Sequence, residues 1–182
     1  GRVCGLSAEP WPASCGDAGE VRIAGRPSSV DETRALVCRA RLLAGALPLT
    51  GFSAADLVDL IGGDHLALAD LAKAFVADGL QSLAELPLDR LGDTENVIEV
   101  VRALRHGGLG VWRATVERAA PADRLDLIER AAVVQRETSA LKAVAPLPRR
   151  DPRDAPSTGY DDVRTIAVAR VMCPASIAIQ VD

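Results

Sequence analysis

The stretch LGVWRATVERAAPADRLDLIERAAVVQRETSALKAVAPL, residues 109–147, contains one complete strand–helix–strand unit. It opens with Leu109–Val116, in which apolar and polar residues alternate as they do in a β-strand. Pro121 then suits the first turn of a helix, where its missing N–H costs no hydrogen bond. The unit closes with the apolar run Leu141–Leu147. Strands that alternate with helices in this way form parallel sheets, so the stretch predicts an α/β fold.

The same alternation extends to both sides of this unit. Further strands are expected at Val21–Ala24, Leu47–Phe52, Leu80–Leu86 and Ser176–Val181. Further helices are expected at Val30–Ala44, at Ala54–Ile61, from Asp64 to Gly79, from Asp93 or Thr94 to His106, and at Asp161–Val171. Residues 1–20 contain Pro10 and Pro12 and show no apolar periodicity. We therefore expect an irregular arm at 1–20 and one domain at 21–182.

Six strands of this kind fit two architectures, an open doubly wound sheet or part of a (β/α)₈ barrel. A complete barrel takes about 250 residues, whereas this chain has 182. We favour a partial (β/α) TIM-type barrel with parallel strands covered by helices. The last strand would keep an open apolar edge, so we expect a homo-oligomer or part of a longer chain. A first residue that is Gly rather than Met also indicates a processed or partial chain.

Composition and charge narrow the range of functions. Nearly half of the residues, 48%, are apolar, as in a packed globular protein. The net charge is -4 and the sequence has no run of Lys or Arg, which argues against a nucleic-acid partner. No stretch reaches the roughly 18 apolar residues of a membrane span, and the first residues do not resemble a signal peptide. We expect a cytoplasmic protein whose partner is a small-molecule metabolite.

Four cysteines, Cys4, Cys15, Cys38 and Cys173, are spaced irregularly and form no Cys-x-x-Cys pair. Structural zinc and iron–sulfur sites use short spacings, so no metal site is predicted. We favour reduced, incidental cysteines in the cytosol. A disulfide or ligand pair between Cys4 and Cys15 is the alternative.

Glycines and histidines give no catalytic motif. The pairs Gly62-Gly63 and Gly107-Gly108 end helices and match neither a Rossmann turn nor a phosphate-binding loop. His65 and His106 lie at helix ends, and nothing near them favours a Ser-His-Asp or Cys-His site. Nucleotide binding by these motifs and nucleophilic catalysis are therefore not expected.

Two predicted strands carry polar side chains that could serve a site. Glu85 lies near the carboxyl end of a strand, where α/β folds place their active sites, although it could simply pair with Arg90. Arg113, Thr115 and Glu117 share one face of another strand. In a barrel this face would look into the interior, where a buried arginine needs an anionic partner. The alternative is that these residues form the solvent-exposed face of an edge strand.

The most distinctive segment is residues 156–170, PSTGYDDVRTIAVAR. Physically it is a turn followed by a capped helix with Asp161 and Asp162 in the positive first turn. It also resembles a signature of the aminofutalosine synthase, cyclic dehypoxanthine futalosine synthase and FO synthase group of radical SAM enzymes. Weaker similarity occurs at residues 78–85, at 123–130 with Gln135, at 145–148 and at 179–182, so that the resemblance covers roughly residues 47–182.

The resemblance implies a (β/α) barrel that carries a [4Fe–4S] cluster, cleaves S-adenosylmethionine and serves menaquinone biosynthesis by the futalosine pathway. On this basis Glu85 would contact the adenosyl ligand. Arg113 and Thr115 would bind an anionic substrate, and Ser157, Thr158 and Asp161 would contribute to the same substrate site.

The chain departs from this family where the cluster is bound. It contains no Cys-x3-Cys-x2-Cys loop, and the glycine run that usually precedes the family's Ala-Glu pair is replaced by Gln81-Ser82-Leu83. Two hypotheses follow: part of a longer radical SAM enzyme, or a non-catalytic paralogue that binds futalosine-like metabolites or a partner enzyme. A plain α/β scaffold without a small-molecule site is the third. In each case we expect no stable cluster on this chain alone.

Overall fold

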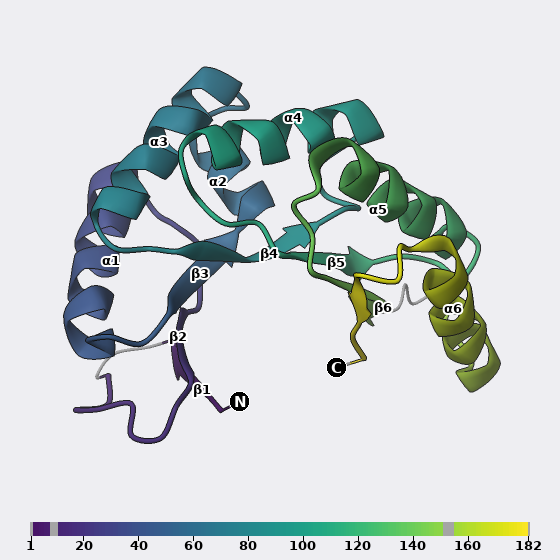
Figure 1. The fold of residues 1–182 in the computed structure, drawn as a ribbon, viewed down its shortest axis with the longest axis horizontal. Coiled ribbons are helices and arrows are strands. Elements are labelled where there is room, and N and C mark those ends of the chain that lie inside the picture. Colours follow the sequence, from purple (N-terminus) through teal and green to yellow (C-terminus); the bar gives the residue numbers. More distant parts are fainter. Residues whose placement is uncertain (1, 8–10, 151–154, 182) are drawn as a thin grey trace. The chain divides into compact units, whose positions relative to one another are not determined.

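The structure is a computed structural model that describes residues 2–7, 11–150 and 155–181. The chain divides into two compact units. Unit 1 comprises residues 1–85 and 102–111, and unit 2 comprises residues 86–101 and 112–182. Figure 1 shows the elements of both units along the chain. Each unit is described separately below.

Helices follow strands along most of the chain, as the sequence predicts. The strands are β1 (Val3–Leu6), β2 (Glu20–Ile23), β3 (Leu49–Ser53), β4 (Ser82–Pro87), β5 (Arg113–Arg118), β6 (Ala143–Arg150) and β7 (Ala178–Ile179). The helices are α1 (Val30–Ala44), α2 (Ala54–Leu60), α3 (His65–Ala77), α4 (Thr94–His106), α5 (Arg124–Thr138) and α6 (Gly159–Met172). Each strand pairs in parallel with the next strand in the sequence. The predicted α/β class with parallel strands is confirmed.

Unit 1 is built on β1, β2, β3 and the first part of β4. The helix α1 begins where Ser29 accepts a hydrogen bond from the backbone N–H of Glu32, and the predicted bounds Val30–Ala44 are confirmed. Both α1 and α2 pack against β3. Close packing also requires glycine at position 107, because a Cβ on Gly107 would overlap the side chain of Ala72 in α3. Only glycine fits at this contact.

The start of the chain differs from the predicted irregular arm. Residues Val3–Leu6 form β1, which pairs with β2 from Glu20 to Ile23. Leu6 is fully buried, so this short strand contributes to the core of unit 1. Residues 1 and 8–10 of the predicted arm lie outside the described part of the chain.

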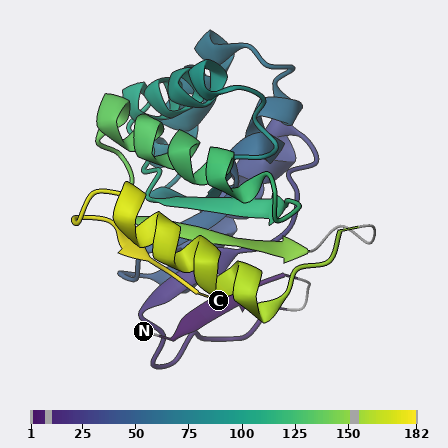
Figure 2. The ribbon, with the colours of Figure 1, turned by 90° about the vertical axis from the view of Figure 1, so that its right-hand side faces the viewer.

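Unit 2 is built on the end of β4 and on β5, β6 and β7. Figure 2 shows α5 and α6 beside each other, and both pack against β6. The buried residues Ala114, Val116 and Val144 come from the strands, and Ile128 and Val134 come from α5. The carboxyl ends of β5 and β6 therefore rest on a packed helical layer.

Two strands begin later than predicted, for a reason visible at the preceding helix ends. Leu80 donates its backbone N–H to the carbonyl of Phe75, and Leu109 donates to Leu104. Gly79 and Gly108, each one residue earlier, have positive φ angles. This is the Schellman arrangement, in which the residue after the glycine makes an apolar contact with the helix it ends. Leu80 and Leu109 thus belong to helix ends, and β4 and β5 begin only at Ser82 and Arg113.

Candidate functional site

A bulge in β6 shapes the carboxyl end of the sheet in unit 2. Thr115 pairs with Ala145, but the next residue, Val116, pairs with Pro148, so Pro146 and Leu147 are extra residues in β6. Proline has no N–H to donate to a neighbouring strand, and the sequence Ala-Pro-Leu-Pro therefore interrupts the ladder. Bulges of this kind redirect side chains and are common next to active sites.

Just before the bulge, three residues form a row across β5, β6 and β7. Thr115 pairs with Ala145, and the backbone N–H of Gln180 donates to the carbonyl of Val144 at 2.9 Å, which places Gln180 beside Ala145. Residues side by side on parallel strands point to the same face. Thr115 is only 3% exposed, and its Oγ1 makes no hydrogen bond within the described part of the chain. A buried hydroxyl without a partner costs about 1–3 kcal/mol.

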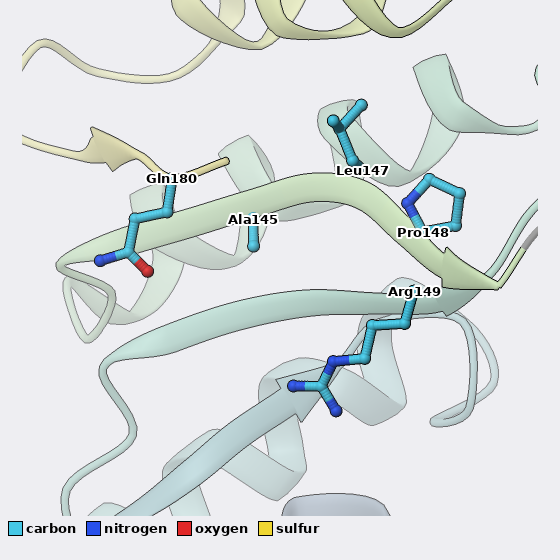
Figure 3. A pocket seen from close by; sticks show the side chains of 5 residues that line it. All are labelled: Ala145, Leu147, Pro148, Arg149 and Gln180. Atoms are coloured by element: carbon cyan, nitrogen blue, oxygen red, sulfur yellow. The ribbon is translucent and has the colours of Figure 1, made fainter. Parts of the chain in front are cut away.

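A hollow of about 290 Å³ opens next to this row (Figure 3). Its lining is formed by Ala145, Leu147, Pro148, Arg149 and Gln180. In Figure 3, Ala145 and Arg149 extend to one side of β6 and Leu147 extends to the other. The hollow thus combines an apolar wall with one guanidinium and one amide group. Its size suits a small metabolite, since small-molecule sites begin near 300 Å³.

Charged side chains of both signs gather at the strand ends around this hollow. Arg118 of β5 pairs in register with Arg150 of β6, and Arg149 lines the hollow itself. Like charges directly opposite each other on neighbouring strands are destabilising. The nearby carboxylate of Asp89 accepts hydrogen bonds from two backbone N–H groups, of Glu117 at 2.9 Å and of Arg118 at 2.8 Å.

The loop that follows β4 is fastened to the same end of unit 2. Glu117 lies 3.5 Å from the guanidinium of Arg90. Arg130 of α5 donates to the carbonyls of Leu88, at 2.8 Å, and of Gly92. These contacts hold the loop in place beside β5, so the site rests on a fixed scaffold.

The predicted substrate residues Arg113 and Thr115 both lie on β5 in unit 2. Arg113 is half-buried and pairs in register with Ala143, whereas Thr115 is buried in the row beside the hollow. The structure thus places Thr115 beside Ala145, which lines the hollow, but not in the lining itself. Substrate binding by Arg113 and Thr115 stays a prediction.

In unit 1, the predicted cofactor residue Glu85 lies at the carboxyl end of β4. It is half-buried and pairs in register with Ser53 of β3. Phe52, just before Ser53, has a φ angle of 58°, which residues other than glycine rarely adopt. The ring of Phe52 packs on Phe75 of α3 at 5.9 Å between centroids. Contact of Glu85 with an adenosyl ligand stays a prediction.

A second hollow, of about 340 Å³, lies in unit 1 between the loop after β2 and α2. It is lined by Arg26, Pro27, Ser28, Asp56, Asp59 and Leu60. Arg26 forms an ion pair with Asp56 at 3.3 Å. This charge pairing within the lining makes the second hollow a weaker candidate for binding a charged ligand.

The segment that carries the family resemblance is explained by helix capping. Thr158 accepts a hydrogen bond from the backbone N–H of Asp161, and Asp161 accepts one from the backbone N–H of Thr158, which is a complete capping box. The hydrogen bond from the Thr158 side chain lowers the pKa of Asp161 below its ordinary value. Ser157 precedes the cap and is half-buried. Substrate binding by Ser157, Thr158 and Asp161 stays a prediction.

Sequence reasoning missed the role of Arg124 in the same region. Its side chain is 1% exposed and donates to the carboxylate of Asp162 at 2.7 Å and to the hydroxyl of Thr165. The interaction joins α5 to the first turns of α6. No pattern within one helix marks this pair, because its members lie on different helices.

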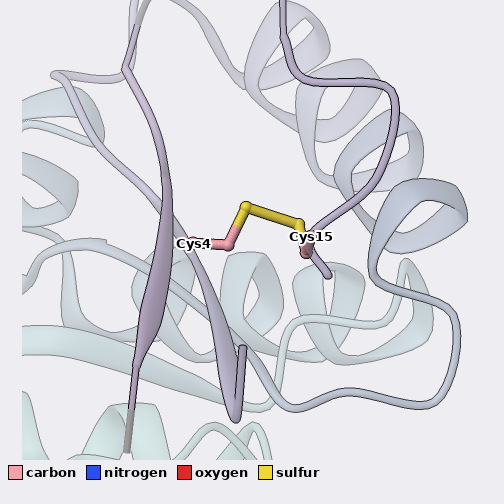
Figure 4. Close-up of a disulfide and its surroundings, with 2 residues drawn as sticks. All are labelled: Cys4 and Cys15. Atoms are coloured by element: carbon pink, nitrogen blue, oxygen red, sulfur yellow. A yellow bond between two sulfur atoms is a disulfide. The ribbon is translucent and has the colours of Figure 1, made fainter. Parts of the chain in front are cut away.

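The favoured interpretation of four reduced cysteines is wrong for two of them. Cys4 of β1 and Cys15 are joined by a disulfide, which was the alternative (Figure 4). Cys38 on α1 is exposed, and Cys173 after α6 is buried. Partial desolvation and the neighbouring carboxylate of Asp78 raise the pKa of the Cys38 thiol, and burial raises the pKa of the Cys173 thiol. Because disulfides are rare in cytosolic proteins, this bond argues against the predicted cytoplasmic location, which stays a prediction.

The residues present do not fit a [4Fe–4S] cluster. Two of the four cysteines form the disulfide, so Cys38 and Cys173 alone are free, fewer than the three of a Cys-x3-Cys-x2-Cys loop. Within residues 2–7, 11–150 and 155–181, no group of three or more His, Cys, Asp or Glu side chains could hold a metal ion. Over the same ranges, no helix combines the length and the hydrophobicity needed to cross a membrane.

Comparison with known proteins concerns the fold. No protein-family model matches the chain, and no curated protein matches it closely enough to count as a relative. Among solved structures, the dihydrodipicolinate synthase DapA-2 from Bacillus anthracis is similar, with a TM-score of 0.50 and 13% sequence identity. The match covers 90% of this chain and 51% of that one, so the chain spans about half its length. The chain has the α/β architecture of a partial (β/α) barrel.

The hollow itself contains two polar residues that sequence reasoning did not select, Arg149 and Gln180. The available signal was Pro146 and Pro148 inside an otherwise apolar strand, since proline in a strand marks a bulge or an edge. Which side chains a bulge brings together depends on the neighbouring strands, and their register is not readable from the sequence.

Proposed function

We propose that this chain binds a small-molecule metabolite at the carboxyl ends of β5, β6 and β7. The observation that carries the proposal is the hollow at the bulge of β6, which Arg149 and Gln180 both line. Two general features support it. Parallel α/β folds bind ligands at the carboxyl ends of their strands, and proline-induced bulges occur next to such sites.

The resemblance of residues 156–170 supports a relation to the aminofutalosine synthase group of radical SAM enzymes. We propose this relation for the fold and for the type of ligand. Because the cysteines do not fit a cluster, we assign no radical step to this chain. The cluster-less alternative, a paralogue that binds a futalosine-like metabolite or a partner enzyme, fits the cysteines better. Homo-oligomerisation or membership of a longer chain belongs to the same proposal, whereas the Cys4–Cys15 disulfide argues against the cytoplasmic location that the sequence predicts.

The test is to fill the hollow and measure binding. Gln180 is exposed at the end of β7, so Gln180→Trp should block the hollow with little effect on folding. Saturation-transfer NMR with a mixture of charged and neutral small metabolites should show at least one saturable ligand for the unmodified chain. The variant should lose it while keeping the same thermal midpoint.

A matched control is Arg136→Gln, on the exposed side of α5. It should bind like the unmodified chain. Absence of any saturable ligand, or equal binding by the blocked variant, would contradict the proposal.

A further inference from the structure

We propose that the hollow in unit 2 is an oxyanion site that holds a carboxylate or phosphoryl group on a small ligand, with Arg149 as its principal contact. This inference rests on the proposed function, because it names the chemical class of the ligand for the same site.

The lining sets the chemistry of the ligand. Arg149 is the one charged residue among the five that line the hollow, and Gln180 is the one amide. A guanidinium offers paired N–H donors that match two oxygens of a carboxylate or phosphate. The amide of Gln180 can donate one more hydrogen bond. The remaining lining, Ala145, Leu147 and Pro148, is apolar, so the rest of the ligand should be compact and apolar.

The charges around the hollow point to the same class. Arg118 and Arg150 face each other in register at the ends of β5 and β6, an arrangement that costs free energy when no anion is near. The carboxylate of Asp89 is engaged by backbone N–H groups, and that of Glu117 by Arg90 at 3.5 Å. A bound oxyanion would relieve the repulsion between the two arginines.

The bulge explains why Arg149 lies at this place. In a regular ladder, Thr115 and Ala145 would be followed by Val116 and Pro146, whereas the observed partner of Val116 is Pro148. The shift by two residues brings Arg149 next to the end of β5, two residues nearer the row than it would otherwise be. The two prolines of the bulge therefore have a positioning role as well as a structural one.

The experiment is an NMR titration of the full chain with three probes: inorganic phosphate, benzoate and the neutral analogue benzamide. We expect saturable shifts of the Ala145 and Gln180 amide signals with phosphate or benzoate and much weaker binding of benzamide. Phosphate binding alone would indicate a phosphoryl ligand, and benzoate binding alone a carboxylate. Arg149→Gln should lower the affinity for the anion by about tenfold or more, and Arg136→Gln should leave the affinity unchanged.

Three outcomes would overturn the oxyanion inference while leaving the proposed function intact. One is benzamide binding as tightly as benzoate. Another is unchanged anion binding by Arg149→Gln when Gln180→Trp still blocks the hollow. Equal weakening by Arg149→Gln and Arg136→Gln would show a diffuse charge effect and would also overturn it. If no probe and no metabolite binds, both proposals fail.

Discussion

Two arginine–aspartate pairs in this chain have the same chemistry but differ in which partner is buried. In unit 2, Arg124 contacts Asp162 at 2.7 Å, and the arginine side chain is 1% exposed while the aspartate is 39% exposed. In unit 1, Arg34 contacts Asp78 at the same 2.7 Å and adds a second hydrogen bond at 3.0 Å, but here the arginine is 44% exposed and the aspartate 11%. By distance and number of bonds alone, the pair in unit 1 would be judged the stronger.

Burial reverses that ranking. The guanidinium of Arg34 is largely exposed, so water solvates it almost as well when the pair is apart, and the pair gains little. A buried arginine has lost its water, so removal of its partner leaves an uncompensated charge, and removal of the arginine leaves a cavity. The comparison shows that the geometry of a contact does not by itself give its contribution to stability.

The largest effect is expected from Arg124→Ala. The substitution removes a buried side chain and its hydrogen bonds to Asp162 and Thr165. We expect a loss of about 3 kcal/mol in the free energy of unfolding, measured by urea denaturation. The double variant Arg124→Met with Asp162→Ala should recover part of the loss, since it refills the space and removes the leftover carboxylate. A loss below about 1 kcal/mol would contradict the account of a buried pair.

A smaller effect is expected from breaking the covalent link in unit 1. The Cys4–Cys15 bond closes a loop with a sequence separation of 11 residues. Loop-closure entropy assigns such a bond about 2–3 kcal/mol. Reduction, or Cys15→Ser, should lower the free energy of unfolding by up to that amount. Cys38→Ser, at an exposed free cysteine, should leave it unchanged. Equal melting of the oxidised and reduced chains would contradict the prediction.

The smallest effect is expected at the Arg34–Asp78 pair, as a change in the pH dependence of stability. The hydrogen bond from Arg34 lowers the pKa of Asp78 below its ordinary value. The pair therefore adds stability above the unfolded-state pKa of about 3.9, and this stability is lost as the pH falls through the folded-state pKa. Arg34→Gln should raise the pKa of Asp78, as followed by NMR of its carboxyl carbon. An unchanged titration would show that the pair does not persist in solution.

Much of the fold can be predicted from the sequence because helix caps and strand patterns depend on residues that are close together in the chain. Ser29 and Glu32 mark the start of α1, which has its predicted bounds. The starts of β4 and β5 were misplaced because Leu80 and Leu109 look like strand residues but make the apolar contact of a helix end. Apolar character alone does not distinguish these two roles.

The features that were missed depend on residues far apart in the chain or on irregular segments. The strand β1 has four residues and a single buried side chain, Leu6, which is too little for a periodic signal. The Cys4–Cys15 bond is predicted only as the alternative, because irregular cysteine spacing does not indicate which cysteines come together.

For the candidate site, the sequence indicated the polar face of β5 with Thr115. Gln180 could not be predicted as a site residue, because it lies beside Ala145 only through the register of two neighbouring strands, which the sequence does not reveal.

The pairing of each strand with its successor has a consequence for how the chain folds. Partners such as Thr115 and Ala145 are about 30 residues apart. No strand has to wait for a distant segment, so contact order within each strand–helix–strand unit stays moderate and folding can advance as the ribosome releases successive units. A substitution that slows one crossover should delay the pairing of its two flanking strands and leave earlier units free to form.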